Sequence, residues 1–492
     1  MKKYIIILFC AAELSTGCKK FLDENPKGLI TDANAIQDIP GLDAALTGAY
    51  KGVTRVWARG FLNASTQGFS MGGDDLTTIP GGNKAEFRQL DQFDVVSTNS
   101  HIAMIWNGCY KMIQGANNVL ANAPKIKYKT PADKAKIDGI VGEAHFLRAL
   151  GYYWVVRGWG SIPLITDIVT SVTPDILNIK KTEPKDVYKV IESDLAAAES
   201  LLPTTKRDPG RPNQGSAKAL LADVYLTEAG WPIKDVSKYA LSAAKAKEVI
   251  DNETLYNFNL VDLSVLWAGN ATAIGTKEEV MAFHASDKFG GSTNSFTGAP
   301  TTPPEEGGWE DYESEINFFY NFPAGKRKDI TFHTIFTKSD GSTVTWQNSI
   351  DGHPYYGKFR IEHNDRWYSS MPVHMMRYAH VLLIYAEAQA RSEGTPNTMA
   401  YTCMNRVRQR AGLPDLTAGL AGAAFADSVV NERAWEFAGE GTTRWFDLQR
   451  LELVETANAN KNVNDLKPIG AITKDDYWFP IPQMDAQINP NL

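Results

Sequence analysis

Cysteine is scarce in this chain, and its scarcity excludes a fold that is stabilised by a framework of disulfides. Four cysteines occur among 492 residues, at positions 10, 18, 109 and 403. None belongs to a CxxC pair, and the two that lie outside the N-terminal segment are far apart in the sequence. Stability must therefore come from a large apolar core, for which the 43% of hydrophobic residues provides the material.

Basic runs and metal-binding motifs are also missing. The net charge is −7, and no cluster of Lys and Arg is present to contact phosphates, so we predict no nucleic-acid partner. The eight histidines show neither HxxxH nor HExxH spacing, and no glycine-rich phosphate loop occurs. We predict no cofactor, no metal site and no catalytic metal, and we leave open a structural calcium ion held by loop carboxylates.

The longest apolar run near the N-terminus is too short to span a bilayer. Tyr4 to Ala12 are mostly apolar, whereas a spanning helix needs roughly 20 such residues. Two lysines precede this run, and small residues lead from it to Gly17 and Cys18, which is typical of a secretory signal. We predict a signal peptide at 1–17, lipidation of Cys18 and a polar tether at 18–33. The alternative is an ordinary secreted protein with an incidental cysteine.

Helical periodicity dominates the rest of the chain. Apolar residues recur with i, i+3, i+4, i+7 spacing. We predict helices at about 36–51, 101–122, 133–157 and 184–202, one that begins near Ser216, and further ones at about 238–250, 374–392, 397–411, 427–438 and 443–451. Alanine at facing positions lets such helices pack closely in antiparallel pairs. The pairs resemble tetratricopeptide repeats, although no strict 34-residue period is present. We predict a mainly α fold, with a helical-repeat region at 34–261.

The segment 262–372 has a different character, rich in Gly, Ser, Thr, Pro and aromatics. Short runs such as Ser342–Trp346 predict hairpins, and long loops in a compact protein are usually functional. Flat aromatic rings can cover the apolar face of a sugar while polar groups bind its hydroxyls. We therefore predict ligand-binding loops in a C-terminal region at 262–492. The candidate contacts are Trp57, Asp74, Trp309, Tyr312, Trp346, Tyr355 and Trp367.

The alternative for each ring is that it fixes a loop to the core, although we expect at least two to form an exposed platform. Two or three covered rings would give weak binding, with a dissociation constant on the order of 0.1–1 mM.

Two patterns suggest catalysis, and neither has the right context. Gly68 to Gly72 spells GxSxG, but the strand before it and the helix after it that a nucleophile elbow needs are not predicted. The segment 431–450 interleaves carboxylates, arginines and aromatics, and the near balance of charges favours a helix corner of ion pairs over an acid–base site. We predict no catalytic residues. A secreted glycoside hydrolase using Asp74 and Glu305 remains the enzymatic alternative.

Several long segments resemble one family. GEAHFLRALGYYWVVRGWGSIPLI (142–165), GRPNQGSAKALLADVYL (210–226), RYAHVLLIYAEAQA (377–390), MNRVRQRAGLP (404–414), NERAWEFAGEGTTRWFDLQRL (431–451) and YWFPIPQMDAQINPNL (477–492) are similar to SusD/RagB outer-membrane lipoproteins of Bacteroidetes. The similarity runs from about residue 18 to the end of the chain.

The resemblance implies a SusD-like fold of four tetratricopeptide-like pairs with long loops and small hairpins, and it places the lipidated cysteine at Cys18. It implies a lipoprotein facing the cell exterior that caps a SusC-like TonB-dependent transporter and captures nutrients, usually oligo- or polysaccharides. A peptide ligand and a purely protein-binding scaffold remain alternatives.

Overall fold

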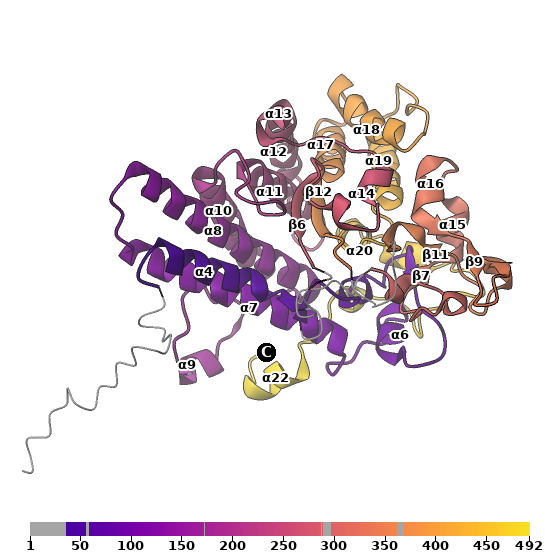
Figure 1. The fold of residues 1–492 in the computed structure, drawn as a ribbon, viewed down its shortest axis with the longest axis horizontal. Helices are drawn as coiled ribbons and strands as arrows, with labels where there is room; N and C mark the ends of the chain where they lie inside the picture. The colour runs from indigo at the N-terminus through magenta and orange to yellow at the C-terminus, as the bar shows by residue number, and fades with distance from the viewer. Residues whose placement is uncertain (1–35, 56–58, 172, 287, 289–296, 362–368) are drawn as a thin grey trace, which may run out of the picture.

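Antiparallel helix pairs form most of the molecule. The computed structural model describes residues 36–492 apart from 56–58, 172, 287, 289–296 and 362–368 (Figure 1). The long helices pack on one another in chain order, so the prediction of a mainly α fold is confirmed. These helices are α4 (Ile39–Lys51), α7 (Ser100–Asn122), α8 (Pro131–Trp159), α10 (Pro184–Leu201), α11 (Gln214–Glu228), α12 (Lys238–Asp251), α17 (Tyr378–Glu393), α18 (Thr398–Arg410) and α19 (Gly422–Glu436).

Local sequence signals explain where these helices begin. Thr130 caps α8 through a hydrogen bond from the backbone N–H of Asp133, whose side chain accepts from Thr130 in return. The cap of α11 is Asn213, three residues before the position near 216 where the periodicity predicts that the helix begins. Asn213 accepts from the N–H of Ser216, and the Ser216 hydroxyl accepts from the N–H of Asn213. Ser216 thus completes the cap without being the cap.

The predicted helix at 374–392 begins later than expected. Residues Val373–Arg377 form strand β12, which pairs antiparallel with β6 (Glu279–Phe283) and contains an irregular register. Both strands are buried throughout. The continuous apolar run in MPVHMM cannot distinguish a buried strand from a buried helix, and tertiary pairing decides in favour of the strand. The strand pair joins the two ends of the loop-rich segment.

Within the described residues, strands occur in short antiparallel pairs. The predicted hairpin at Ser342–Trp346 is confirmed in its central residues, because β10 (Thr343–Thr345) pairs with β9 (Ile335–Thr337). The remaining pairs are β1 (Thr54–Arg55) with β2 (Arg59–Gly60), β3 (Leu76–Thr77) with β7 (Glu313–Ser314), β4 (Ile162–Pro163) with β5 (Lys181–Thr182), and β8 (Phe332–His333) with β11 (Tyr355–Tyr356).

Short helices connect these parts. The α-helical ones are α5 (Ser65–Gly68), α6 (Ala85–Asp91), α9 (Pro174–Leu177), α13 (Glu253–Tyr256), α14 (Leu263–Leu266), α15 (Ile316–Asn321), α16 (Lys326–Thr331), α20 (Arg444–Arg450), α21 (Val454–Asn458) and α22 (Gln483–Ile488). The 3-10 turns are η1 (Ala123–Lys125), η2 (Ala271–Ala273), η3 (Ala299–Thr301), η4 (Pro304–Glu306), η5 (Trp346–Asn348), η6 (Gly357–Phe359) and η7 (Lys474–Tyr477).

One large apolar core runs from α4 to Tyr477, so it crosses the predicted boundary at 261/262. That boundary stays a prediction. A second small core of Ile316, Phe336, Trp346 and Tyr355 lies in the loop-rich part. It belongs to the region of α15 and β9 at the right-hand end of Figure 1.

Candidate ligand-binding site

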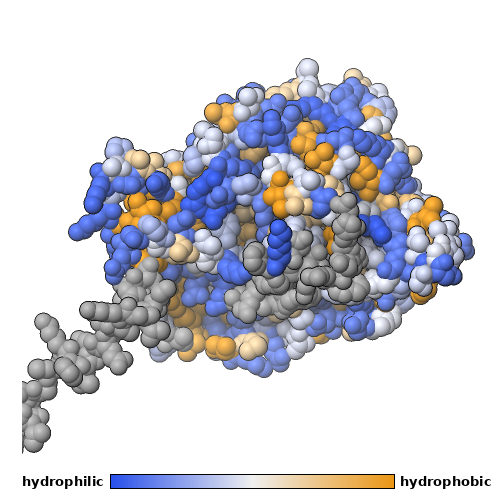
Figure 2. Space-filling view, in the orientation of Figure 1, coloured by the Kyte–Doolittle hydropathy of each residue, from blue (hydrophilic) through white to orange (hydrophobic). Residues whose placement is uncertain are grey.

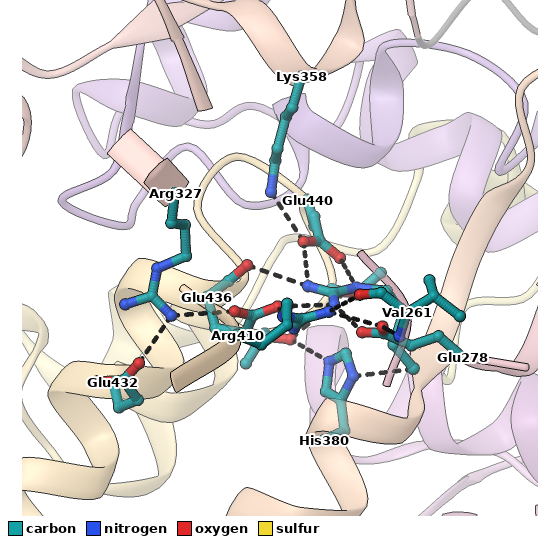
Figure 3. A network of polar contacts seen from close by, with 12 residues as sticks. Val261, Glu278, Arg327, Lys358, His380, Arg410, Glu432, Glu436 and Glu440 are labelled. Atoms are coloured by element: carbon teal, nitrogen blue, oxygen red, sulfur yellow. Dashed lines mark hydrogen bonds and ion pairs between the residues drawn. The ribbon is translucent and has the colours of Figure 1, made fainter. Parts of the chain in front are cut away.

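The loop-rich segment is fastened to the helices by a buried ion network (Figure 3). Arg327 on α16 and Arg377 on β12 both donate to Glu436 on α19, over 3.0 and 2.8 Å. Lys358 in η6 donates to Glu440 over 2.8 Å. All five side chains are buried. Since removing one partner would leave a buried charge without compensation, the network holds the loops in a defined place.

The interpretation of 431–450 as an ion-paired helix corner is confirmed. Arg433 and Asp447 pair at 2.7 Å, and both are buried. Burial alone would raise the pKa of Glu436, but the surrounding guanidinium groups hold this pKa below its ordinary value. Asp447 also pairs with Arg450 inside the segment. The other charges pair with residues outside it, and these are Glu432, Glu436, Glu440 and Arg444.

A carboxyl pair joins two loops: Glu310 lies between η4 and β7, and Asp351 lies between η5 and β11. We call this pair, together with Trp309 and Asp311, the acidic rim. The side chains of Glu310 and Asp351 are hydrogen-bonded to each other, and burial followed by the charge of Asp351 raises the pKa of Glu310 to about 7. The carboxyl group of Glu310 is therefore partly protonated near neutral pH. Trp309 is half-buried next to it, and its backbone N–H donates to the carbonyl of Ala299 over 2.8 Å.

Contacts to the N-terminal part hold this rim in position. Asp311 forms a salt bridge with Lys84, which is itself buried. The hydroxyl of Thr78 donates to the backbone carbonyl of Asp311 over 3.0 Å. The β3–β7 pair adjoins these contacts, since β3 ends directly before Thr78 and β7 begins two residues after Asp311. Residues that are more than 200 positions apart thus meet at one loop.

Beneath the rim lies a buried hydrogen-bond chain. The Tyr355 hydroxyl donates to Asp351 over 2.6 Å. The two ring nitrogens of His353 lie 2.8 Å from the carbonyl of Asp351 and 2.9 Å from the carboxylate of Asp465. Burial alone would lower the pKa of His353, but the charge of Glu313 and the hydrogen bond to Asp465 raise this pKa to about 9. A protonated His353 therefore balances part of the negative charge under the rim.

Three of the predicted aromatics are buried, so the expectation that they form an exposed platform is wrong for them. Tyr312 is fully buried against Tyr356 and Phe359, with ring centroids 6.4 Å apart in both cases. Trp346 and Tyr355 are buried in the second core. They fix the loops to the core, which is the alternative that the sequence left open.

Asp74 and the GxSxG serine have structural partners. The carboxylate of Asp74 accepts two hydrogen bonds from Arg444, over 2.5 and 2.6 Å. The hydroxyl of Ser70 is buried and donates to the carbonyl of Gly441 over 2.6 Å. These two groups connect the segment before β3 to the loop before α20 and to the first residue of α20. The remaining predicted residues, Cys18, Trp57 and Trp367, lie outside the described residues.

Comparison with known proteins identifies the family. A model described as the SusD family matches residues 328–492, and a model described as "Starch-binding associating with outer membrane" matches residues 20–226. SusD-like protein P2 of Formosa agariphila is 29% identical over 100% of this chain and 99% of its own length. The chain belongs to the SusD/RagB family.

Solved SusD structures agree with this assignment over nearly the whole chain. A SusD superfamily protein from Parabacteroides distasonis superposes with a TM-score of 0.78 at 24% identity, covering 94% of this chain and 99% of that protein. A laminarin-binding SusD-like protein superposes with a TM-score of 0.72 at 23% identity, covering 92% of this chain and 98% of that protein. The SusD fold is therefore common to all three.

In this SusD/RagB protein one exposed ring among the described loop residues was missed by the sequence prediction. Tyr320 on α15 is 57% exposed, and its ring centroid lies 5.7 Å from that of Phe319 and 5.9 Å from that of Trp346. Ile335 and Ile350 are also exposed in this region. Figure 2 shows an apolar patch at the right-hand end of the molecule, over the position of β9 in Figure 1.

The segment INFFYN contains no signal for the exposure of Tyr320, because Ile316, Phe319 and Tyr320 have the i, i+3, i+4 spacing of one helical face. Glu310 and Asp351 were missed because 40 positions separate them and no spacing rule connects them. Among the described residues, no group of three or more His, Cys, Asp or Glu side chains is arranged to hold a metal ion. None of the described helices is long and apolar enough to cross a membrane.

Proposed function

We propose that this protein is a cell-surface lipoprotein that binds oligo- or polysaccharide and delivers it to a SusC-like TonB-dependent transporter. The observation that carries the proposal is the half-buried Trp309 beside the hydrogen-bonded Glu310–Asp351 pair, on a loop fixed to a rigid core. A ring next to carboxyl groups suits a sugar, because the ring covers C–H groups and the carboxyls bind hydroxyls. A structural relative is described as laminarin-binding, which supports a glycan as the ligand class.

The geometry of the rim favours binding over hydrolysis. Glycosidases hold their two carboxyl groups about 5–9.5 Å apart so that a sugar or a water fits between them. The carboxyl groups of Glu310 and Asp351 are in hydrogen-bond contact, which leaves no such space. The carboxylate of Asp74 is occupied by Arg444, and Glu305 accepts from the N–H of Ile350 over 2.7 Å. We therefore propose a non-enzymatic role.

Affinity electrophoresis on a panel of polysaccharides, including laminarin, starch and xylan, tests the ligand class. We expect at least one polymer to retard the protein, and we expect Trp309→Ala and Asp351→Asn to reduce the retardation. Tyr128→Ala is the matched control, since Tyr128 is 54% exposed and follows η1 in the helical part. If none of the polymers retards the protein while transporter binding stays intact, the protein is instead a protein-binding scaffold. If the protein hydrolyses a polymer and Asp74→Asn abolishes the hydrolysis, the protein is instead a glycoside hydrolase.

Metabolic labelling tests the anchor. Since the signal pattern ends at Cys18, labelled palmitate should enter the wild-type protein and should not enter Cys18→Ala. The wild-type protein should fractionate with the outer membrane, and the variant should be released. Co-purification of a TonB-dependent transporter from native membranes tests the partner. Cytosolic fractionation of the unlabelled wild-type protein would contradict the proposed location.

A further inference from the structure

A polar cavity of about 280 Å³ lies away from the acidic rim, in the helical part of the molecule. One wall is the loop between α10 and α11, residues 205–210. The other wall is formed by Tyr256 and Asn257 at the end of α13 and by residues 275, 276 and 279 before and within β6. The volume is near the lower end of about 300–1,000 Å³ that is usual for small-molecule pockets, so one small molecule fits and a polymer does not.

The cavity contains a lysine without a carboxylate partner. The ammonium of Lys206 donates to the backbone carbonyl of Glu279 over 2.5 Å and lies 5.6 Å from the ring centroid of Phe258. Among the described residues, no carboxylate oxygen lies within ion-pair distance of it. An ammonium has three donors, so two remain available. Burial lowers the pKa of Lys206 to about 8 despite the charge of Glu279, which is the effect of an uncompensated site.

The neighbouring charges cannot serve Lys206, because they have partners of their own. Glu279 accepts from the N–H of Gly275 and from His284, each over 3.0 Å. Arg207 on the other wall pairs with Asp43 at 2.7 Å. Asp208, which also lines the cavity, pairs with Arg207 and Arg211. The lining charges thus balance overall, but Lys206 is the one among them without an ion-pair partner in the described part of the chain.

A second polar group in the cavity also lacks a partner. The hydroxyl oxygen of Thr276 is buried and has no hydrogen-bond partner in the structure. Buried hydroxyls are normally bonded, so an unsatisfied one in a cavity wall indicates a missing acceptor or donor. The side chains of Thr205 and Asn257 line the same cavity and can bind hydroxyl groups.

We infer that this cavity is a second ligand site that takes one small molecule bearing a carboxylate, held by the ammonium of Lys206 and the hydroxyl of Thr276. A sugar acid and a small organic acid share this chemistry. The carboxylate supplies the negative charge and the acceptors that Lys206 lacks. The site is independent of the glycan site, because none of its residues belongs to the acidic rim.

Isothermal titration of the full-length mature protein with glucuronate, glucose and acetate tests the inference. We expect saturable binding of glucuronate, with glucose weaker by about tenfold or more, since a charge-assisted hydrogen bond is lost. Lys206→Met should weaken glucuronate by about tenfold or more, and Lys277→Met, which removes a neighbouring exposed lysine, should have no effect. Tighter binding of glucuronate than of acetate assigns a sugar acid, and equal binding assigns small organic acids.

Equal binding of glucuronate and glucose, or unchanged binding by Lys206→Met, would overturn the inference. Thr276→Val provides a second variant in case Lys206→Met does not fold, and it should also weaken glucuronate. Retardation by polysaccharide should be unchanged in Lys206→Met. A failure of the carboxylate site therefore leaves the proposed glycan function intact, and a failure of glycan binding leaves the carboxylate site intact.

Discussion

The helical part of the molecule and its loop-rich part are held together by different forces. Between α4 and α7, small residues let two backbones approach closely, as where Gly115 faces Ala49. Around β12 and α19, buried arginines and glutamates join segments that no regular element connects. Close apolar packing needs only a repeating pattern of small side chains. A long loop has no such pattern, so it is held by directional bonds to a few fixed charges.

The difference bears on function, because the segment proposed to contact ligand is the one held by charges. Apolar packing tolerates small adjustments, whereas a buried ion pair has one good geometry. The rim is attached through Lys84 and Asp311 on one side, and the loops behind it through Lys358 and Glu440 on the other. The ligand loops are thus held by ion pairs, whereas the helices are held by apolar packing.

The largest expected effect follows from removing the central arginine of the network. Arg377 is fully buried and contacts Glu278, Glu436 and Glu440. Arg377→Met would leave these carboxylates under-compensated, so we expect a loss of about 3–5 kcal/mol in the free energy of unfolding, measured by chemical denaturation. Lys134→Met is the control, since it breaks only an exposed pair that is worth about 0–1 kcal/mol. Equal losses in both variants would contradict the role of the network.

A methyl group added between two helices tests the close packing of the helical part. A Cβ at Gly115 would lie 2.6 Å from the Cα of Ala49, so α7 would have to move, and we expect Gly115→Ala to destabilise by about 1–3 kcal/mol. At Gly139 on α8 a Cβ would meet only Pro203, at 3.9 Å. Gly139→Ala should therefore be neutral or stabilise by up to about 1 kcal/mol through helix propensity. Thermal melting of both variants would show whether close packing matters, and similar melting temperatures would argue against it.

The pH dependence of stability tests the contribution of one buried carboxyl group, that of Asp75. Asp75, next to the loop before α20, accepts from the N–H of Gly439, and burial raises its pKa to about 7. Its folded pKa lies above the unfolded value near 3.8, so the contribution is complete below about pH 4 and is lost as the pH rises towards 7. Relative to wild type, Asp75→Asn should flatten this fall by about 1–2 kcal/mol between pH 5 and 7.5. An identical slope in the two proteins would show that Asp75 does not titrate in this range.

The helices were predictable because their signals are local. The pattern at 184–202 contains its own start at Pro184 and its own stop at Pro203, and the structure places α10 within one residue of that range. The strand β12 was not predictable, because its partner β6 lies about 90 positions away and an apolar run is compatible with either state.

The candidate site was less predictable than the fold for the same physical reason. Tyr312, Trp346 and Tyr355 have the composition of a sugar platform, but tertiary packing turns them inward. The acidic rim depends on the meeting of Glu310 with Asp351, which no periodicity encodes. Composition thus indicated a segment rich in loops, whereas the exposure of each ring was decided by contacts from elsewhere in the chain.

The smallest expected effect on stability concerns the exposed ring of the loop region. Tyr320 is 57% exposed and has only partial contact with Phe319 and Trp346, so Tyr320→Ala should cost less than about 1 kcal/mol in the free energy of unfolding. If glycans also contact the apolar patch around β9, the same variant should reduce retardation by polysaccharide, while Tyr128→Ala should not. Tyr320 would then serve binding and not folding, whereas the buried Trp346 beneath it serves folding. Unchanged retardation would confine the ligand to the acidic rim, because the apolar patch would then lie outside the glycan path.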